Sequence, residues 1–221
     1  MKKKLVIFGS GQIAQLAHFY FSTDSNYEVV AFTVDPEFLN DTTFCGLPVV
    51  SFDSVADLYP ATEHEMFVAL SYSKLNSIRA NKFIATKEMG YALATYLSSK
   101  ATYLSDAPPG ENCFILEDNT IQPFVSIGDN VTLWSGNHIG HHSIIGSHCF
   151  IASHVVISGG VKVGEYCFVG VNATLRDHIT IGERCVLGAG TLILGDAEAD
   201  GVYVGAASTR SKIPSSRLKN L

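Results

Sequence analysis

An aliphatic residue recurs at every sixth position through the C-terminal half of the chain. The series runs without a slip over fourteen repeats: Ile115, Ile121, Ile127, Leu133, Ile139, Ile145, Ile151, Ile157, Val163, Val169, Leu175, Ile181, Leu187 and Ile193. In seven repeats the next residue is glycine: Gly128, Gly140, Gly146, Gly164, Gly170, Gly182 and Gly188. A short period kept over this length indicates a solenoid, in which each repeat packs only against its neighbours.

Six residues suit one short strand and one sharp corner. We therefore expect three strands to close a triangular coil of eighteen residues, with the aliphatic side chains inside. Successive coils then stack as parallel strands roughly 4.8 Å apart. The same spacing places Cys149, Cys167 and Cys185 in one column below Val131. Because a buried free cysteine behaves as a small hydrophobe, this column is predicted to be core rather than a metal site.

The first half alternates short apolar runs with helical patterns, which predicts a small parallel sheet. The expected strands are 4–8, 28–33, 67–70 and 93–97, and the expected helices are 12–22 and 76–89. Pro108, Pro109 and Gly110 mark a boundary. We predict domains over 1–107 and 108–200, and a tail over 201–221.

Charge and hydropathy exclude several classes of partner. A net charge of −6 argues against a general nucleic-acid binder. No apolar run approaches the length of a membrane span, and the run after the N-terminal lysines is too short for a signal peptide. We therefore expect a cytoplasmic protein with no membrane partner, whose five cysteines stay reduced.

Three features together resemble a known family: the six-residue register, Gly46–Val49 after the second expected strand, and the stretch from Gly140–His142 to Gly159. They are similar to bacterial hexapeptide acyltransferases, in the branch of nucleotide-sugar N-acetyltransferases and sialic acid O-acetyltransferases. The resemblance implies an α/β N-terminal Rossmann-like domain followed by a left-handed parallel β-helix. It also implies a homotrimer that binds acyl-CoA in the groove between neighbouring β-helices.

Histidine is concentrated just before the middle of the repeat array. Five of the eight histidines fall there, none at an inward aliphatic position: His138, His141, His142, His148 and His154. The resemblance implies that His141 is the general base. Imidazole suits this task because it titrates near neutrality. His142 stands where the family often has a carboxylate, so Asp177, two coils further in the same column, is an alternative partner; His142 is also the alternative base.

Gly159 follows His141 by eighteen residues and should stack on it one coil away. Its amide could donate a hydrogen bond to a thioester carbonyl as that oxygen gains charge, and the family's oxyanion donor aligns there. The alternative is a glycine required only at a corner. The resemblance further places the CoA arm against four small residues: Gly170, Val171, Gly188 and Ala189. The family's usual final Gly-x-Pro-Ala-Lys turn is replaced by Val204–Arg210, so Arg210 or Lys212 is a candidate phosphate contact.

Gly9-x-Gly11-x-x-Ala14 follows an expected strand and opens an expected helix. Such a turn presents backbone amides to phosphate, which suits either a dinucleotide or a nucleotide sugar. The resemblance favours the sugar nucleotide. It implies six contact residues: Ser10, Gly11, Gln12, Asp35, Ser71 and Tyr72.

The sequence as a whole favours an acetyl-CoA-dependent N-acetyltransferase. Its acceptor would be the amino group of a nucleotide-linked deoxysugar used in cell-surface polysaccharide or glycan synthesis, and no metal is expected. O-acetylation of a sugar hydroxyl is the alternative with the same base. A zinc enzyme like the γ-class carbonic anhydrases is disfavoured because their His-x4-His spacing is missing. A non-catalytic scaffold is the remaining alternative.

Overall fold

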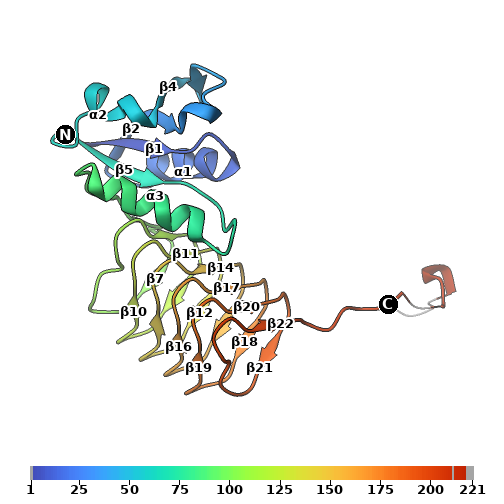
Figure 1. Cartoon of the computed structure of the whole chain (residues 1–221). Helices are drawn as coiled ribbons and strands as arrows, with labels where there is room; N and C mark the ends of the chain where they lie inside the picture. Colours follow the sequence, from blue (N-terminus) through green and yellow to red (C-terminus); the bar gives the residue numbers. More distant parts are fainter. Residues whose placement is uncertain (1, 211, 218–221) are drawn as a thin grey trace.

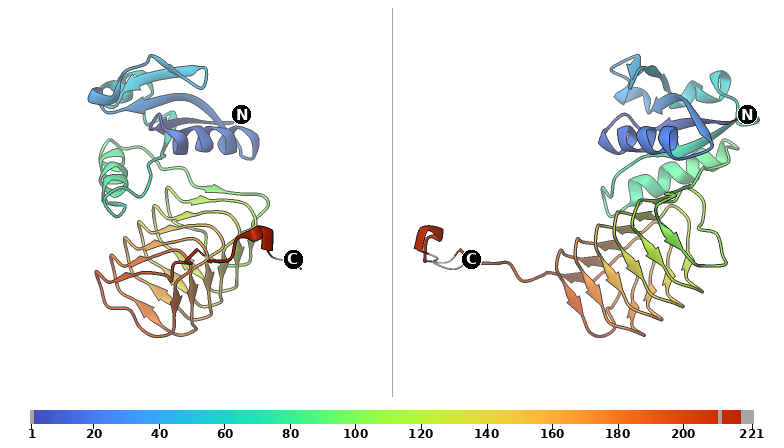
Figure 2. Two further views of the ribbon diagram at one scale, coloured as in Figure 1. Left: turned by 90° about the vertical axis from the view of Figure 1, so that its right-hand side faces the viewer. Right: turned by 180° about the vertical axis from the view of Figure 1, so that it is seen from behind.

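The structure is a computed structural model that describes residues 2–210 and 212–217. Figure 1 shows an α/β unit seated on the first coils of a three-sided prism, with the C-terminal segment leaving the last coil. The views in Figure 2 show the coils stacked in one direction away from the α/β unit. Among the described residues, no helix has the length and apolar character needed to cross a membrane.

The α/β unit contains a five-stranded sheet in the order β3-β4-β2-β1-β5, parallel except for β3. Its strands are β1 (Lys3–Phe8), β2 (Tyr27–Val34), β3 (Thr43–Phe44), β4 (Leu47–Ser51) and β5 (His64–Val68). Its helices are α1 (Gln12–Thr23), α2 (Val55–Leu58) and α3 (Ser77–Glu88), and short 3₁₀ turns cover Pro36–Phe38 and Phe52–Ser54.

Helices cover both faces of this sheet. Leu5 and Ile7 of β1 share a core with Phe21 of α1, whereas Val6 and Phe8 share the other core with Phe83 of α3. A strand buried on both faces needs apolar residues at every position, and for this reason β1 is a continuous apolar run rather than an alternating one. The predicted βαβ start is therefore confirmed.

The prism consists of two-residue strands arranged in three parallel sheets. One sheet holds β6 (Tyr96–Leu97), β8 (Phe114–Ile115), β11 (Thr132–Leu133), β14 (Phe150–Ile151), β17 (Phe168–Val169), β20 (Val186–Leu187) and β22 (Val202–Tyr203). The second holds β7 (Thr102–Tyr103), β9 (Thr120–Ile121), β12 (His138–Ile139), β15 (Val156–Ile157), β18 (Thr174–Leu175) and β21 (Leu192–Ile193). The third holds β10 (Ser126–Ile127), β13 (Ile144–Ile145), β16 (Lys162–Val163) and β19 (Thr180–Ile181).

The eighteen-residue coil is confirmed by the strand register. Leu133 pairs with Ile115 on one side and with Ile151 on the other. All fourteen aliphatic positions are buried, and the most exposed, Ile193, retains 7%. The cysteine column is also core: Cys149, Cys167 and Cys185 are free thiols with 0% exposure.

Strands of the prism begin earlier than the repeat pattern suggested. Within the expected strand 93–97, Leu93 forms a single bridge to Met66 of the α/β sheet, while Tyr96–Leu97 is β6 and pairs with β8. β7 likewise pairs with β9. The sequence does not reveal these two strands because they precede the unbroken aliphatic series. Both lie before residue 108, where the domain boundary was predicted.

The corners explain most of the histidine spacing. The residue three places after each aliphatic position, from 118 to 190, has a positive φ. These corner residues are Asp118, Phe124, Asn130, Gly136, His142, His148, His154, Gly160, Tyr166, Asn172, His178, Arg184 and Gly190. Left-handed backbone favours glycine but also admits Asn, Asp and His more readily than other residues. The six-residue spacing of His142, His148 and His154 thus has a structural cause, which His141 does not share.

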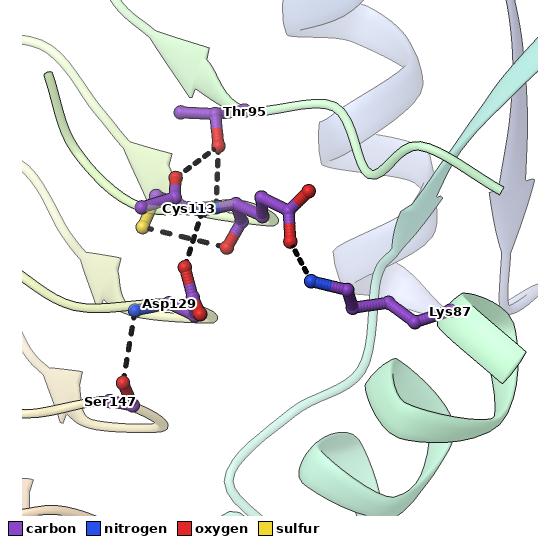
Figure 3. Close-up of polar contacts among 7 residues, drawn as sticks. Lys87, Thr95, Cys113, Asp129 and Ser147 are labelled. Carbon is purple, nitrogen blue, oxygen red and sulfur yellow. Dashed lines mark hydrogen bonds and ion pairs between the residues drawn. The ribbon is translucent and has the colours of Figure 1, made fainter. Parts of the chain in front are cut away.

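The α/β unit is joined to the first coils by polar contacts as well as by its core. Lys87, at the end of α3, forms an ion pair with Glu111, and Figure 3 shows the Lys87 side chain directed from the helix toward the coils. Asp129 accepts a hydrogen bond from the Glu111 amide at 2.8 Å, and its own amide donates to Ser147 Oγ at 3.1 Å. These hydrogen bonds link three successive coils, and the ion pair joins the end of α3 to the first of them.

Candidate active site

The loops after β1, β2 and β5 meet at the carboxyl edge of the α/β sheet. The Gly9 amide donates to Thr33 O at 2.8 Å, and the Ala69 amide donates to Phe8 O at 2.9 Å. Gly9 has φ +119°, and a Cβ there would lie 3.0 Å from Ala69 O. Glycine is required at this crossing because it alone combines that backbone conformation with so close an approach. Ligands of open parallel sheets bind at such an edge.

The N-terminus of α1 opens onto this edge. Ser10, Gly11 and Gln12 are exposed. No side chain caps α1, and its first turn holds no acidic residue. The free amides and the helix dipole leave a partial positive charge, which suits the phosphate group expected here.

Asp35 lies at the same edge but already has a partner. Its carboxylate accepts a 2.5 Å ion pair from Lys82 of α3, whose ammonium also lies 4.2 Å from the centre of the Phe52 ring. The ammonium is 4.7 Å from the Phe8 ring as well. Sequence reasoning missed Lys82, because nothing in a helical pattern shows that one lysine turns toward the sheet edge. The pair gives this edge one anion and one cation.

Tyr72 connects this edge to the prism. Its ring lies 4.9 Å from that of Phe150 and 4.8 Å from that of Phe168, measured between centroids. A hollow of about 360 Å³ opens beside it, lined by Tyr72, Trp134, Phe150, Ala152, Ser153, Phe168, Gly170, Val171 and Ala189. The hollow therefore brings together one residue expected to contact the sugar nucleotide and three expected to contact CoA. Gly188 is the residue preceding Ala189 but does not itself line it.

Sequence reasoning missed Trp134, the single tryptophan of the chain. It stands at the glycine position of its repeat, directly after the aliphatic Leu133, which was the available signal. Its indole Nε1 is buried and has no hydrogen-bond partner within the described chain.

His141 stands at another corner of the prism. Its ring lies over Gly159: a Cβ on Gly159 would be 2.6 Å from His141 Cε1 and 2.7 Å from Nε2. The expected stacking of these two residues is confirmed. Within the described residues the Gly159 amide donates no hydrogen bond, so it is available to a substrate oxygen.

The neighbouring histidine, His142, contacts His141. His141 Nδ1 and His142 Nδ1 are 3.1 Å apart, and the His141 amide donates to Gln122 Oε1 at 2.9 Å. When His141 Nδ1 donates in this pair, Nε2 is left unprotonated and able to accept a proton. His142 in turn packs on Phe124, with 4.7 Å between ring centroids. Asp177 contacts neither histidine and instead pairs with Arg176 at 3.7 Å.

Within one chain, the hollow and His141 lie on different corners of the prism. The hollow follows strands of the seven-stranded sheet, such as β17, whereas His141 follows β12 of the six-stranded sheet. One whole face of the prism separates them. Arg210 is exposed in the C-terminal segment that follows the last coil. Within the described residues, no three His, Cys, Asp or Glu side chains gather as a metal-binding group.

The repeat segment matches a known family. The model of the bacterial transferase hexapeptide (six repeats) matches residues 125–159 and 160–195. The match covers the middle and later coils of the prism, where the six-residue register is unbroken. No curated protein matches the chain in a sequence search.

Solved structures share the whole fold, not only the hexapeptide prism. The acetyltransferase domain of PglB from Neisseria gonorrhoeae matches at TM-score 0.81 and 21% identity, covering 92% of this chain and 97% of its own. PerB from Caulobacter crescentus, in complex with CoA and GDP-perosamine, matches at TM-score 0.80 and 24% identity, covering 91% and 94%. WeeI from Acinetobacter baumannii matches at TM-score 0.77 and 19% identity, covering 92% of this chain and 97% of its own.

Proposed function

We propose that the protein is an acetyl-CoA-dependent N-acetyltransferase that acts on the amino group of a nucleotide-linked amino-deoxysugar, for cell-surface polysaccharide or glycan synthesis in the cytoplasm. The observation that carries the proposal is the hollow shared by Tyr72 with Gly170, Val171 and Ala189. PerB supports it, since that protein holds CoA and GDP-perosamine on the same fold. The α/β unit then serves as the Rossmann-like nucleotide-sugar domain, and the prism as a left-handed β-helix.

In this proposal, different residues of the chain bind the two substrates and carry out the transfer. The amides of Gly11 and Gln12 bind the diphosphate at the N-terminus of α1, and Ser71 and Tyr72 hold the sugar above the prism. Small residues at Gly170, Val171, Gly188 and Ala189 let the extended pantetheine arm lie flat, and Arg210 meets a CoA phosphate. His141 Nε2 takes the proton from the amine as the amine nitrogen bonds to the thioester carbon, and the Gly159 amide donates a hydrogen bond to the thioester oxygen as negative charge develops there. The carbon–sulfur bond then breaks, and CoA leaves as the thiol after its sulfur takes the proton from His141.

The activity is tested directly by mixing the protein with acetyl-CoA and UDP-, dTDP- or GDP-linked amino sugars. We expect CoA release and gain of one acetyl group with one of these acceptors. The matched control is the same sugar nucleotide with a hydroxyl in place of the amine. Transfer to that hydroxyl alone would instead support an O-acetyltransferase, and no transfer to any acceptor would reject the proposal.

We predict a homotrimer, because the candidate site is complete only when His141 of one copy faces the hollow of another. Sedimentation equilibrium at micromolar concentration should give three chains per particle. A second check mixes His141→Asn protein with Tyr72→Ala protein under conditions of subunit exchange. Mixed trimers should recover part of the activity that each variant lacks. A monomer with full activity would contradict the shared site.

We predict that Gly11→Asp raises the KM for the sugar nucleotide far more than the KM for acetyl-CoA. A Cβ at Gly11 meets no atom within 4 Å, so the variant should fold, while its carboxylate would repel the approaching phosphate. Gly11→Asn is the matched control of nearly the same size without the charge. Steady-state kinetics with each substrate varied in turn measures the effect. Equal rises in both KM values would place the phosphate elsewhere.

A further inference from the structure

The turn between β5 and α3 has an unusual backbone. Lys74, Leu75 and Asn76 are three successive residues with φ of 48°, 53° and 63°. Everywhere else in the described chain, non-glycine residues with positive φ occur singly. The left-handed conformation is unfavourable for residues that carry a Cβ, and it persists only where surrounding contacts enforce it. Such strain commonly accompanies a functional site.

Asn76 ties this turn to the prism. Its side chain is completely buried, and its Nδ2 donates to Cys167 O at 3.3 Å and to Tyr166 O at 3.5 Å. Cys167 O already accepts the ladder hydrogen bond of the Phe150 amide at 2.9 Å. The asparagine therefore uses the second lone pair of a strand carbonyl, which docks the turn onto the seven-stranded sheet at a fixed height.

Arg79, one turn into α3, makes a second attachment to the same sheet. It retains 2% exposure and donates to Cys149 O at 3.0 Å, to Asn76 Oδ1 at 3.2 Å and to the Thr132 hydroxyl. All its hydrogen-bond acceptors are neutral. Burial lowers the pKa of the guanidinium to about 10, which still leaves it charged near neutral pH. A buried charge that pairs with no carboxylate is costly, so its retention calls for a positional role.

The turn held in this way carries the exposed wall of the hollow. The Asn76 amide donates to Tyr72 O at 3.1 Å, and the Tyr72 ring packs on Phe150 and Phe168. The guanidinium carbon of Arg79 lies 5.8 Å from the centroid of the same Phe150 ring. Because the Tyr72 side chain keeps 49% exposure, its own packing fixes it weakly. Its position depends on the backbone that Asn76 and Arg79 hold.

We propose that Asn76 and Arg79 are positioning residues, which hold the strained turn against the prism so that Tyr72 forms the acceptor wall of the hollow. The identity of the acceptor, a nucleotide-linked amino sugar, rests on the proposed function. The positioning itself does not, because it follows from contacts within this chain. The two parts can therefore be tested separately.

The test uses Asn76→Gly, which tolerates the left-handed backbone but removes both hydrogen bonds that Asn76 Nδ2 donates to the sheet. Trp134 lines the hollow and is the only tryptophan, so its fluorescence reports the hollow without any substrate. We expect its emission to shift to longer wavelength and its quenching by acrylamide to rise. The KM for the sugar nucleotide should rise about tenfold, while kcat and the KM for acetyl-CoA change less than about twofold. Asn26→Gly, an exposed position before β2, is the matched control and should change none of these values.

A double-mutant cycle shows whether Asn76 acts through Tyr72. In a Tyr72→Ala background, Asn76→Gly should add nothing to the KM for the acceptor. Additive effects, or unchanged Trp134 quenching in a folded variant, would overturn the proposal. Should Asn76→Gly not fold, Thr132→Val removes only the hydroxyl that Arg79 contacts, and the same readouts decide. If the wild-type protein acetylates no amino-sugar nucleotide, the proposed function fails, while Trp134 quenching still decides whether the turn is held.

Discussion

His141→Asn should lower kcat by about 10²- to 10⁴-fold, the usual worth of a general base, and leave the KM for acetyl-CoA nearly unchanged. The side chain is exposed at a corner, so its loss should not disturb the core. Its ring nitrogen Nε2 lies over Gly159. In the proposed function the proton acceptor and the oxyanion donor therefore come from adjacent coils. Removing the proton acceptor alone should therefore lower the rate of the chemical step.

The decisive comparison is His142→Asn assayed beside it. His142 has φ +60°, which asparagine tolerates, so this variant should also keep the backbone. If His142 only orients His141 through the 3.1 Å contact between their Nδ1 atoms, its loss should cost less activity. Should His141→Asn keep more than about a tenth of the activity while His142→Asn loses nearly all, the base is His142. If both stay active, no side chain at this corner serves as the base.

The prism could be predicted in detail from the sequence because its signal is local and repeated. Every aliphatic position has the same inward environment, so the assignment of one repeat is supported by all the others. The α/β start was also visible, since β1 is a strand buried on both faces and ends in the Gly9–Gly11 turn. By contrast β6 and β7 lie outside the aliphatic series, and only the register with β8 and β9 identifies them as coils of the prism.

The part of the candidate site that follows the repeat was predictable, whereas the part where the α/β unit meets the prism was not. The stacking of His141 on Gly159 follows from an eighteen-residue spacing. The contacts of Arg79 and Lys82 do not, because they depend on how α3 lies between the seven-stranded sheet, which Arg79 contacts, and the edge of the α/β sheet, which Lys82 contacts. The left-handed corners show a further limit. A histidine every six residues suggests shared chemistry, yet at His142, His148 and His154 the spacing reflects backbone conformation.

Gly164→Ala should be among the most destabilising small substitutions in the prism. A Cβ there would lie 2.6 Å from Glu183 N and 2.8 Å from Gly182 C. These are backbone atoms of the next coil, held in the ladder, so they cannot turn aside as a side chain would. Overpacking of this kind typically costs about 1–3 kcal/mol. For a chain of this size, each kcal/mol lowers Tm by roughly 2–4 °C.

Gly195→Ala provides the matched control, because a Cβ there meets no atom within 4 Å. It should leave Tm unchanged or raise it slightly by restricting the unfolded chain. Thermal unfolding of the two variants beside the wild type separates two roles for the repeat glycines. If close stacking requires a glycine at this position, only Gly164→Ala loses stability. Equal Tm values would mean that the coils separate at little cost, and that glycine there serves only the bend of the chain. Because Gly140 stands against Ser158 and Gly159 in the same way, with 2.5 Å between its would-be Cβ and the Gly159 nitrogen, the same spacing would also set the height of His141 over the Gly159 amide.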